Sequence, residues 1–330
     1  MFSAKLLAWY DQEQRELPWR NTVKNPYHTW LSEVMLQQTT VATVIPRFQD
    51  FIKKWPTLQD LARASIDEVL TEWQGLGYYS RARNLHKCVQ LLARAFPSTE
   101  AELIKLPGIG PYTAAAIASI AFDQKAAAVD GNVMRVLSRY FALNTPKPIE
   151  EVYEKLKTLL PNKRCGDFTQ ALMELGALQC RPVSPFCKVC PLRENCQAYI
   201  LGKVENFPVK LPKQKIPTRY TTAFILKRED GAILLRKRLP QGLLGGMMEV
   251  PTTPWEEKKK EKDITGPIVR HTFTHFHLEV EVCHLHHASD FEGIWVHPGD
   301  FKNYALPTVM KKILKVGLNG MQESIVYTAK

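Results

Sequence analysis

The sequence predicts a multidomain protein in which an all-α part is followed by a smaller α+β part. Apolar residues recur with helical spacing through residues 1–202, and no stretch there alternates as a strand does. After residue 219, short alternating runs bounded by turn residues replace the helical pattern. The chain of 330 residues also exceeds the size of an average domain. We therefore predict a helical domain at 1–202, a linker at 203–219 and a second domain at 220–330.

Most of the excess positive charge lies in the helical part. Lysine and arginine outnumber aspartate and glutamate by nine in residues 1–219 but by only two in 220–330, and the formal net charge is +11. This distribution favours a nucleic acid as the partner, with anionic lipid headgroups as the weaker alternative. No run approaches the ~20 apolar residues of a membrane span, and the first residues lack the pattern of a signal peptide. We expect a cytoplasmic protein that does not contact a membrane.

The helical part is predicted to consist of short helices separated by proline and glycine turns. A first helix runs through residues 1–20 until Pro18 stops it. Further helices are predicted at 48–55, 58–73, 84–96, 149–160 and 168–178.

One more predicted helix, at 29–45, carries a carboxyl group beside its apolar face. Glu33 lies at the border of that face, and a solvated flanking position is its ordinary interpretation. Gln38 falls in the middle of the face, so it either ends the helix or has a function there. The apolar face itself would collect Trp30, Leu31, Val34, Met35, Ala42 and Ile45.

The turn at 74–83 combines two glycines, two tyrosines and two arginines. Aromatic rings such as that of Tyr78 can stack on bases or wedge between them, and arginines can hold phosphates. A glycine-aromatic turn packed on the core is the alternative interpretation.

The sequence Leu-Pro-Gly-Ile-Gly at 106–110 opens directly into an alanine-rich helix. Gly108 and Gly110 leave few competing side chains, so the first N–H groups of that helix, with the positive end of its dipole, can hold a phosphate oxygen. A packing corner between two helices is an equally good interpretation. Asp130 follows in a second turn, which begins another apolar helix.

Four cysteines crowd into one loop at 180–196. Their spacing is Cys180-x6-Cys187-x2-Cys190-x5-Cys196, interspersed with prolines and basic residues. Structural zinc is one interpretation, but zinc sites usually draw two short knuckles from separated segments. One continuous loop of four thiolates better matches a [4Fe–4S] cluster. The remaining cysteines, at 88, 165 and 283, are interpreted as ordinary buried thiols.

The second domain is predicted to be of α+β type. Strands are expected at 220–227, 232–238, 278–285 and 293–296, followed by a helix at 307–316. Asp230-Gly231 predicts a hairpin between the first two of these strands.

Histidines gather in the second domain and raise the question of a metal site. On a strand, His275 and His277 would share a face, as would His284 and His286. No aspartate or cysteine completes a ligand set, so the alternative is favoured, in which a loop tip at 273–276 inserts a ring and a hydrogen-bonding side chain into a nucleic acid.

Taken together and in order, the motifs resemble those of the MutY-type adenine DNA glycosylases of the helix-hairpin-helix family, which also contains endonuclease III. The motifs are Leu-Pro-Trp-Arg at 17–20, Trp-Leu-Ser-Glu-Val-Met-Leu-Gln-Gln-Thr at 30–39, Gly-Leu-Gly-Tyr-Tyr at 75–79, Leu-Pro-Gly-Ile-Gly at 106–110, Asp-Gly-Asn-Val at 130–133, the four-cysteine loop and His-Thr-Phe-Thr-His at 271–275.

The resemblance implies an all-α helix-hairpin-helix glycosylase domain in which two carboxyl groups carry the chemistry. Glu33 would act as general acid and base, delivering a proton to N7 of a flipped adenine, and partial desolvation at the edge of an apolar face would raise its pKa toward neutrality. Asp130 would lie near the sugar C1′ and stabilise a developing oxocarbenium ion. Tyr112 stands where relatives that also cut the DNA backbone have a lysine that forms a Schiff base. A monofunctional glycosylase is therefore implied, with Tyr112 and Asn132 orienting Asp130 and the water.

The resemblance also implies which residues contact DNA. Arg15, Leu17 and Trp19 match positions that line the adenine pocket. Gln38 and Tyr78 match positions that enter the duplex where the bases part, which partly offsets the cost of base flipping.

The second domain resembles the Nudix fold, whose characteristic turn matches residues 242–251. A Nudix hydrolase needs a glutamate-rich helix for magnesium, and Glu256, Glu257 and Glu261 lack the required spacing. A domain kept for recognition is therefore implied. Family members read 8-oxoguanine with a Phe-Ser-His loop. This chain has Phe273, Thr274 and His275, so that the hydroxyl is kept and a methyl group is added.

Three hypotheses follow for the function. The leading one is hydrolysis of the N-glycosidic bond of adenine opposite 8-oxoguanine or guanine in double-stranded DNA, by a protein expected to be a monomer. A glycosylase with lyase activity of the endonuclease III type is the enzymatic alternative. A non-catalytic sensor of DNA damage or redox state is the alternative from another class.

Overall fold

The computed structural model describes residues 1–20, 23–92, 95–146, 148–209, 212, 215–259, 266–285 and 291–319. The chain divides into two units. The first consists of Met1–Arg63 and Asn84–Pro212, and the second consists of Ala64–Arg83 and Lys213–Lys330. The predicted boundaries at 202 and 220 stay a prediction.

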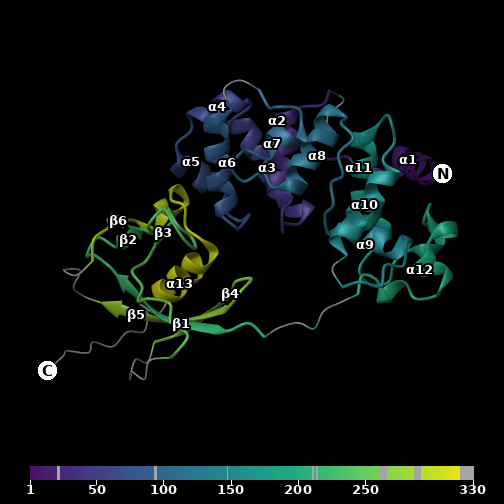
Figure 1. Ribbon diagram of the computed structural model, residues 1–330. Coiled ribbons are helices and arrows are strands. Elements are labelled where there is room, and N and C mark those ends of the chain that lie inside the picture. The colour runs from purple at the N-terminus through teal and green to yellow at the C-terminus, as the bar shows by residue number, and fades with distance from the viewer. Residues whose placement is uncertain are drawn as a thin grey trace. The chain divides into compact units, whose positions relative to one another are not determined.

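The first unit is all-helical in its described residues, as predicted (Figure 1). Helix α6 begins in the second unit and continues into the first. A central core between α1, α9, α10 and α11 contains Leu6, Leu137, Val152 and Phe168, all fully or almost fully buried. The helices are α1 (Phe2–Glu13), α2 (Pro26–Leu36), α3 (Val41–Lys54), α4 (Leu58–Arg63), α6 (Ser80–Leu91), α7 (Glu100–Leu103), α8 (Pro111–Phe122), α9 (Gly131–Tyr140), α10 (Ile149–Leu159), α11 (Cys165–Glu174) and α12 (Gln197–Ile200).

Two expected helices end earlier than the sequence pattern indicates. Helix α1 ends at Glu13, well before Pro18, because Gln14 already has an extended backbone. The single helix expected at 29–45 is wrong, since Gln38 adopts a left-handed φ of 56° and separates α2 from α3. Ala42 is consequently exposed and does not share the buried face of α2. The expectation that Gln38 either ends the helix or has a function is thus met in its first part, because the helix is interrupted there.

The helix expected at 58–73 is likewise two helices, α4 and α5 (Ile66–Glu72). Ser65 caps α5, since its hydroxyl accepts a hydrogen bond from the Glu68 N–H and the Glu68 side chain accepts one from the Ser65 N–H. This capping box fixes a new helix start inside a continuous apolar pattern.

The glycine hairpin before α8 depends on glycine at one position. Gly108 has a φ of +76°, and a Cβ atom there would lie 2.6 Å from the Cβ of Asn84. Gly110 is the N-cap of α8 and Pro111 occupies the first helical turn, a combination that begins a helix without a capping side chain. The first N–H groups of α8 are therefore not taken by a side chain of the N-cap residue.

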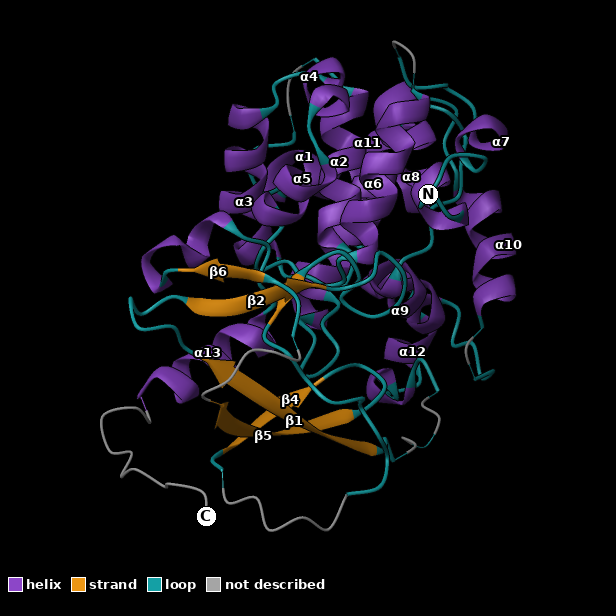
Figure 2. Cartoon of the chain, turned by 90° about the vertical axis from the view of Figure 1, so that its left-hand side faces the viewer, coloured by secondary structure: helices purple, strands orange, loops and turns teal. Residues whose placement is uncertain are grey.

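The second unit contains two small sheets, drawn in orange in Figure 2. In the first sheet β1 (Thr218–Leu226) pairs in parallel with β5 (His277–Leu285), and β4 (Ile268–Thr272) pairs antiparallel with β5. In the second sheet β2 (Ile233–Lys237) lies between β3 (Met248–Glu249) and β6 (Ile294–Val296), antiparallel to both. Helix α13 (Thr308–Asn319) packs on the first sheet. The predicted α+β class is confirmed.

The predicted hairpin between the first two strands forms only at its turn. The Asp-Gly turn does form, with Gly231 at φ +89°, but only one bridge, Lys227 to Ile233, joins its two arms. The strands diverge because β1 pairs with β5 in one sheet and β2 with β3 and β6 in the other.

Several side-chain patterns in the second unit also differ from expectation. His275 lies in the turn before β5, so it shares no strand face with His277. His286 and Glu261 lie outside the described residues. The described part of the glutamate-rich segment, through Lys259, contains no helix. None of the helices in the described ranges combines the length and apolar character that crossing a bilayer requires.

Candidate active site

A cavity of about 620 Å³ in the first unit brings together distant parts of the sequence. Its walls come from the segment after α1, from α2 and the turn that follows it, from the first turns of α8 and α9, and from α11. Eight of the residues predicted from sequence line this cavity: Arg15, Leu17, Trp19, Glu33, Gln38, Tyr112, Asp130 and Asn132.

Glu33 is a buried carboxyl group, with 8% of its surface exposed. The interpretation of this residue as a solvated flank of the helix is therefore wrong. Burial raises the pKa of its carboxyl to about 7, and the charge of Asp130 acts in the same direction, while the Tyr112 hydrogen bond and Arg20 act against it. Glu33 can thus hold a proton near neutral pH.

Tyr112 holds the Glu33 side chain in place. Its hydroxyl, in the first turn of α8, donates a hydrogen bond of 2.6 Å to Glu33 Oε2. Burial and the nearby Glu33 and Asp130 carboxylates raise the pKa of this phenol well above its ordinary value. Tyr112 therefore stays protonated and donates a hydrogen bond to Glu33 across the whole neutral range.

Asp130 is the N-cap residue of α9. Its carboxylate accepts hydrogen bonds from the Val133 N–H at 2.7 Å and from Asn132 Nδ2 at 2.8 Å. A local capping rule thus fixes the direction in which the second carboxylate points.

Arg135 holds Asn132 from the other side. One terminal nitrogen of Arg135 donates to Asn132 Oδ1 at 2.8 Å and to the Gly176 carbonyl at 2.7 Å. Its Nε donates to the Cys180 carbonyl at 2.8 Å. The amide of Asn132 is therefore fixed between an arginine and the carboxylate of Asp130, and Arg135 was not expected from the sequence.

The same cavity contains a second buried glutamate, on α11, which was not predicted from the sequence. Glu174 on α11 is 1% exposed. Each of its two carboxylate oxygens accepts a hydrogen bond of 2.8 Å from Arg15, and one of them also accepts a hydrogen bond of 2.7 Å from Arg20. Although burial acts in the opposite direction, these bonds and charges hold the pKa of Glu174 below its ordinary value. The sequence did contain a signal for this residue, because Glu174 lies among the apolar residues that form the buried face of α11.

The turn after α2 also closes the cavity. Gln37 donates from Nε2 to Thr113 Oγ1 at 3.2 Å, which ties the end of α2 to the start of α8. Gln38, the next residue, lies in the left-handed region and lines the same cavity.

The remaining predicted DNA contacts lie elsewhere. Tyr78, Phe273, Thr274 and His275 line a cavity of about 450 Å³ within the second unit. The hydroxyls of Tyr78 and Thr274 are 2.6 Å apart, and the Phe273 ring stacks on Phe276 with centroids 4.8 Å apart. Gly108 and Gly110 line neither cavity.

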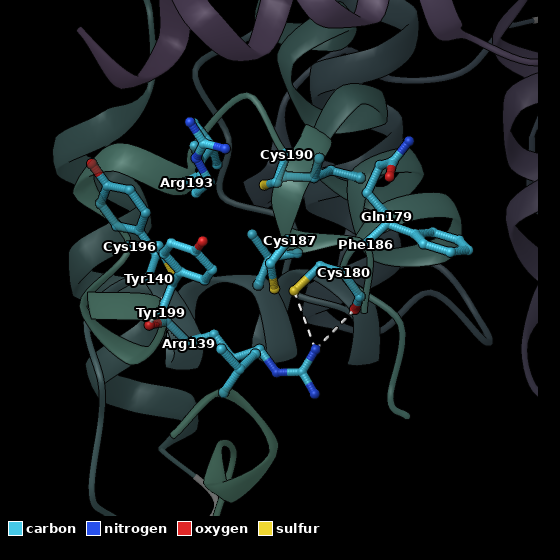
Figure 3. A pocket seen from close by; sticks show the side chains of 14 residues that line it. Arg139, Tyr140, Gln179, Cys180, Phe186, Cys187, Cys190, Arg193, Cys196 and Tyr199 are labelled. Carbon is cyan, nitrogen blue, oxygen red and sulfur yellow. Dashed lines mark hydrogen bonds between the residues drawn. The ribbon is translucent and has the colours of Figure 1, made fainter. Parts of the chain in front are cut away.

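The four cysteines of the 180–196 loop line a third cavity, shown in Figure 3. Cys180, Cys187, Cys190 and Cys196 are all free thiols, and Arg139 donates to Cys180 Sγ at 3.3 Å. In the described ranges no set of three or more histidine, cysteine, aspartate or glutamate side chains is placed to hold a metal ion. Four thiols that line one cavity supply one sulfur ligand for each of the four iron atoms of a cluster. This donor set fits a [4Fe–4S] cluster.

Two family models match the chain. Residues 31–162 match the model of the HhH-GPD superfamily base excision DNA repair proteins, and residues 222–316 match that of the NUDIX domain. These ranges correspond to most of α2–α10 and to the two sheets with most of α13.

Sequence comparison finds relatives along almost the whole chain. The adenine DNA glycosylase of Homo sapiens is 37% identical over 403 residues, which cover 96% of this chain and 73% of the relative. The adenine DNA glycosylase of Buchnera aphidicola subsp. Schizaphis graminum is 34% identical over 345 residues and covers 96% of this chain and 98% of the relative.

Solved structures resemble a large part of the chain. A thermostable thymine-DNA glycosylase matches with a TM-score of 0.56 and 30% identity, covering 61% of this chain and 95% of that protein. Endonuclease III in a non-covalent complex with DNA matches with a TM-score of 0.52 and 26% identity, covering 61% and 94%.

Proposed function

The chain belongs to the adenine DNA glycosylase family, and from this premise we propose that it hydrolyses the N-glycosidic bond of adenine opposite 8-oxoguanine or guanine in duplex DNA. The observation that carries the proposal is the pair of carboxyl groups in one cavity. Glu33 is buried and hydrogen-bonded to Tyr112, while Asp130 is held by Val133 and Asn132. The two environments suit an acid and a charged stabiliser.

In this proposal Glu33 is the general acid. Adenine is a poor leaving group because its departing nitrogen carries negative charge, so a proton delivered to N7 lowers the barrier. A carboxyl with a pKa of about 7 is partly protonated at neutral pH and gives up its proton readily there. Leu17 and Trp19 line the same cavity and offer apolar surface to the flipped base.

Asp130 stabilises the positive charge that develops on the sugar. As the bond to adenine lengthens, charge accumulates at C1′ and the ring oxygen, and a fixed carboxylate opposes it electrostatically. The hydrogen bonds from Val133 and Asn132 hold that carboxylate in one orientation before the reaction begins. Little reorganisation is then needed at the transition state.

Tyr112 supports hydrolysis without strand cleavage. Its phenol donates to Glu33 and cannot form the Schiff base that a lysine would form with the sugar. The product is therefore an abasic site. Borohydride trapping tests the alternative: a covalent protein–DNA adduct that disappears when one lysine is substituted would favour a bifunctional glycosylase.

The cavity of the second unit is proposed to read the base opposite adenine. Thr274 and His275 offer hydrogen-bonding groups beside the ring of Phe273, and Tyr78 supplies an exposed aromatic ring at the same cavity. This arrangement suits a planar base with polar edges. We place 8-oxoguanine there, and the added methyl group of Thr274 tightens the space around its hydroxyl.

We further propose that Cys180, Cys187, Cys190 and Cys196 hold a [4Fe–4S] cluster. When bound, the cluster supplies a rigid centre for the loop, on which Arg181, Lys188 and Arg193 face DNA phosphates. The protein should then show a visible absorption band that bleaches on reduction. A colourless protein with stoichiometric zinc would contradict this assignment.

One assay tests the enzymatic proposal directly. Adenine release is measured under single turnover from duplexes that contain adenine opposite each of the four bases and opposite 8-oxoguanine. We expect release opposite 8-oxoguanine and guanine and none opposite thymine, with Asp130→Asn as the matched inactive control. Lesion binding with no base released under any condition would support the sensor hypothesis instead.

A further inference from the structure

Arg139 is a buried cation at the edge of the cysteine cavity. It lies on α9 and is 2% exposed. Among the described residues no carboxylate lies within ion-pair distance of it. A buried charge without a countercharge is costly, because it has lost its water and gained only neutral partners. The position of Arg139 therefore points to a negative group beside it that is not a carboxylate.

The guanidinium of Arg139 faces the cysteine loop. Its Nη1 lies 3.3 Å from Cys180 Sγ and 3.3 Å from the Cys180 carbonyl, the contacts that are dashed in Figure 3. The same nitrogen donates to the Arg181 carbonyl at 2.6 Å, and Nη2 donates to the Pro182 carbonyl at 3.2 Å. Three consecutive residues at the start of the loop are thus held by one side chain.

Arg139 also holds the end of the helical unit. Its Nε donates to the Phe207 carbonyl at 3.0 Å. The fork of the guanidinium therefore joins α9, the first ligand of the loop and the segment that follows α12. A lysine, with one nitrogen and no fork, could satisfy only part of this set.

We propose that Arg139 is the charge-compensating and positioning residue of the cysteine cavity, and that it raises the reduction potential of the cluster and slows its loss. This inference rests on the proposed [4Fe–4S] cofactor. Four thiolates outweigh the positive charge of a cluster core, so the loaded site is an anion. A buried cation beside one sulfur stabilises this anionic cluster. It stabilises the one-electron reduced cluster even more, because the reduced form carries one more negative charge.

Arg193 provides a matched control in the same cavity. It lines the cavity with Arg139, and its Nη1 donates to the Lys188 carbonyl at 2.9 Å. Unlike Arg139, Arg193 is exposed, so water screens its charge. The two arginines differ in burial and in contact with sulfur, while their charge and side chain are the same.

The test compares Arg139→Met and Arg139→Lys with Arg193→Met and Arg193→Lys in the full chain. Protein-film voltammetry measures the one-electron reduction potential, with the electron supplied by the electrode, and iron release to a chelator measures cluster loss. We expect Arg139→Met to lower the potential and speed iron release severalfold. Arg139→Lys should lie between this variant and the wild type, and both Arg193 variants should match the wild type.

The outcomes separate this inference from the cofactor proposal. A wild-type protein without iron or cluster signals overturns the cofactor assignment itself. In the alternative outcome, the wild-type protein contains a cluster while the Arg139 variants have the same reduction potential and the same rate of iron release as the wild type. That result overturns only the role of Arg139. If Arg139→Met yields no folded protein, the rates of iron release from Arg139→Lys and Arg193→Lys are compared. Faster release from Arg139→Lys supports the role of Arg139, and equal release refutes it.

Discussion

Two glutamates that line one cavity have pKa values shifted in opposite directions. Glu33 and Glu174 are both buried, at 8% and 1% exposure, and both lie on helices of the first unit. Burial raises the pKa of Glu33 to about 7, whereas Arg15 and Arg20 hold the pKa of Glu174 below its ordinary value despite its burial. The partner within hydrogen-bond distance, and not burial alone, decides which glutamate is an acid.

The comparison also separates function from stability. Burial makes the charged form of Glu33 unfavourable, and the hydrogen bond from the neutral Tyr112 phenol offsets this only in part, so Glu33 keeps a proton near neutral pH. Glu174 closes an ion-pair network that joins α11 to the segment after α1. The same cavity therefore combines a carboxyl group that resists ionisation with a carboxylate that two arginines hold in its charged form.

The largest expected effect is on catalysis at Glu33. Glu33→Gln keeps the size and can still accept the Tyr112 hydrogen bond but removes the acidic proton. We expect single-turnover adenine release to fall by about 10²–10⁴-fold, the usual contribution of a positioned general acid. A variant that releases adenine at the wild-type rate would show that Glu33 is not the acid.

The next effect is on stability at Glu174. Glu174→Gln leaves two guanidinium groups facing a neutral amide in a mostly buried wall. We expect the free energy of unfolding to fall by about 3 kcal/mol, toward the low end for broken buried ion pairs because Arg15 still reaches solvent. Urea unfolding at neutral pH measures the change. Unchanged stability would remove the distinction drawn between the two glutamates.

An effect on stability of similar size but opposite sign is expected for Glu33→Gln. The folded-state pKa of Glu33 is raised, so its contribution to stability is present below the unfolded pKa and is lost as pH rises toward about 7. Glutamine has no such loss. The variant should match the wild type near pH 4.5 and be about 3 kcal/mol more stable at pH 8, as urea unfolding at both values measures. A difference that does not grow with pH would contradict the raised pKa.

The smallest expected effect is a shift of the pH profile. Because the proposed mechanism requires protonated Glu33, the rate of adenine release should fall as pH rises through about 7. The Tyr112 hydrogen bond favours the charged form of Glu33, so Tyr112→Phe should raise its pKa and move the falling limb to higher pH. Single-turnover rates between pH 5 and 9 test this. A limb that stays in place, or moves to lower pH, would mean that the phenol does not tune Glu33.

Much of the fold could be predicted because its signals are local. Helical periodicity identified most helices of the first unit, and Gly108, Gly110 and Pro111 marked the hairpin before α8 through their backbone preferences. Errors arose where one residue redirected the chain, as Gln38 does between α2 and α3. The hairpin error in the second unit has another cause, since the turn is local but the partner of β1 lies some sixty residues away.

For the candidate site, the sequence by itself determined which chemical groups are present and how Asp130 is oriented. Asp130 caps its own helix, and its contacts lie within three residues along the chain. Only the tertiary structure decided the environment of Glu33 and revealed Glu174, whose arginine partners are 159 and 154 residues distant. The reason is physical. Capping acts between neighbours in sequence, whereas desolvation and charge act through space, and the packing of α2, α8 and α11 sets those distances.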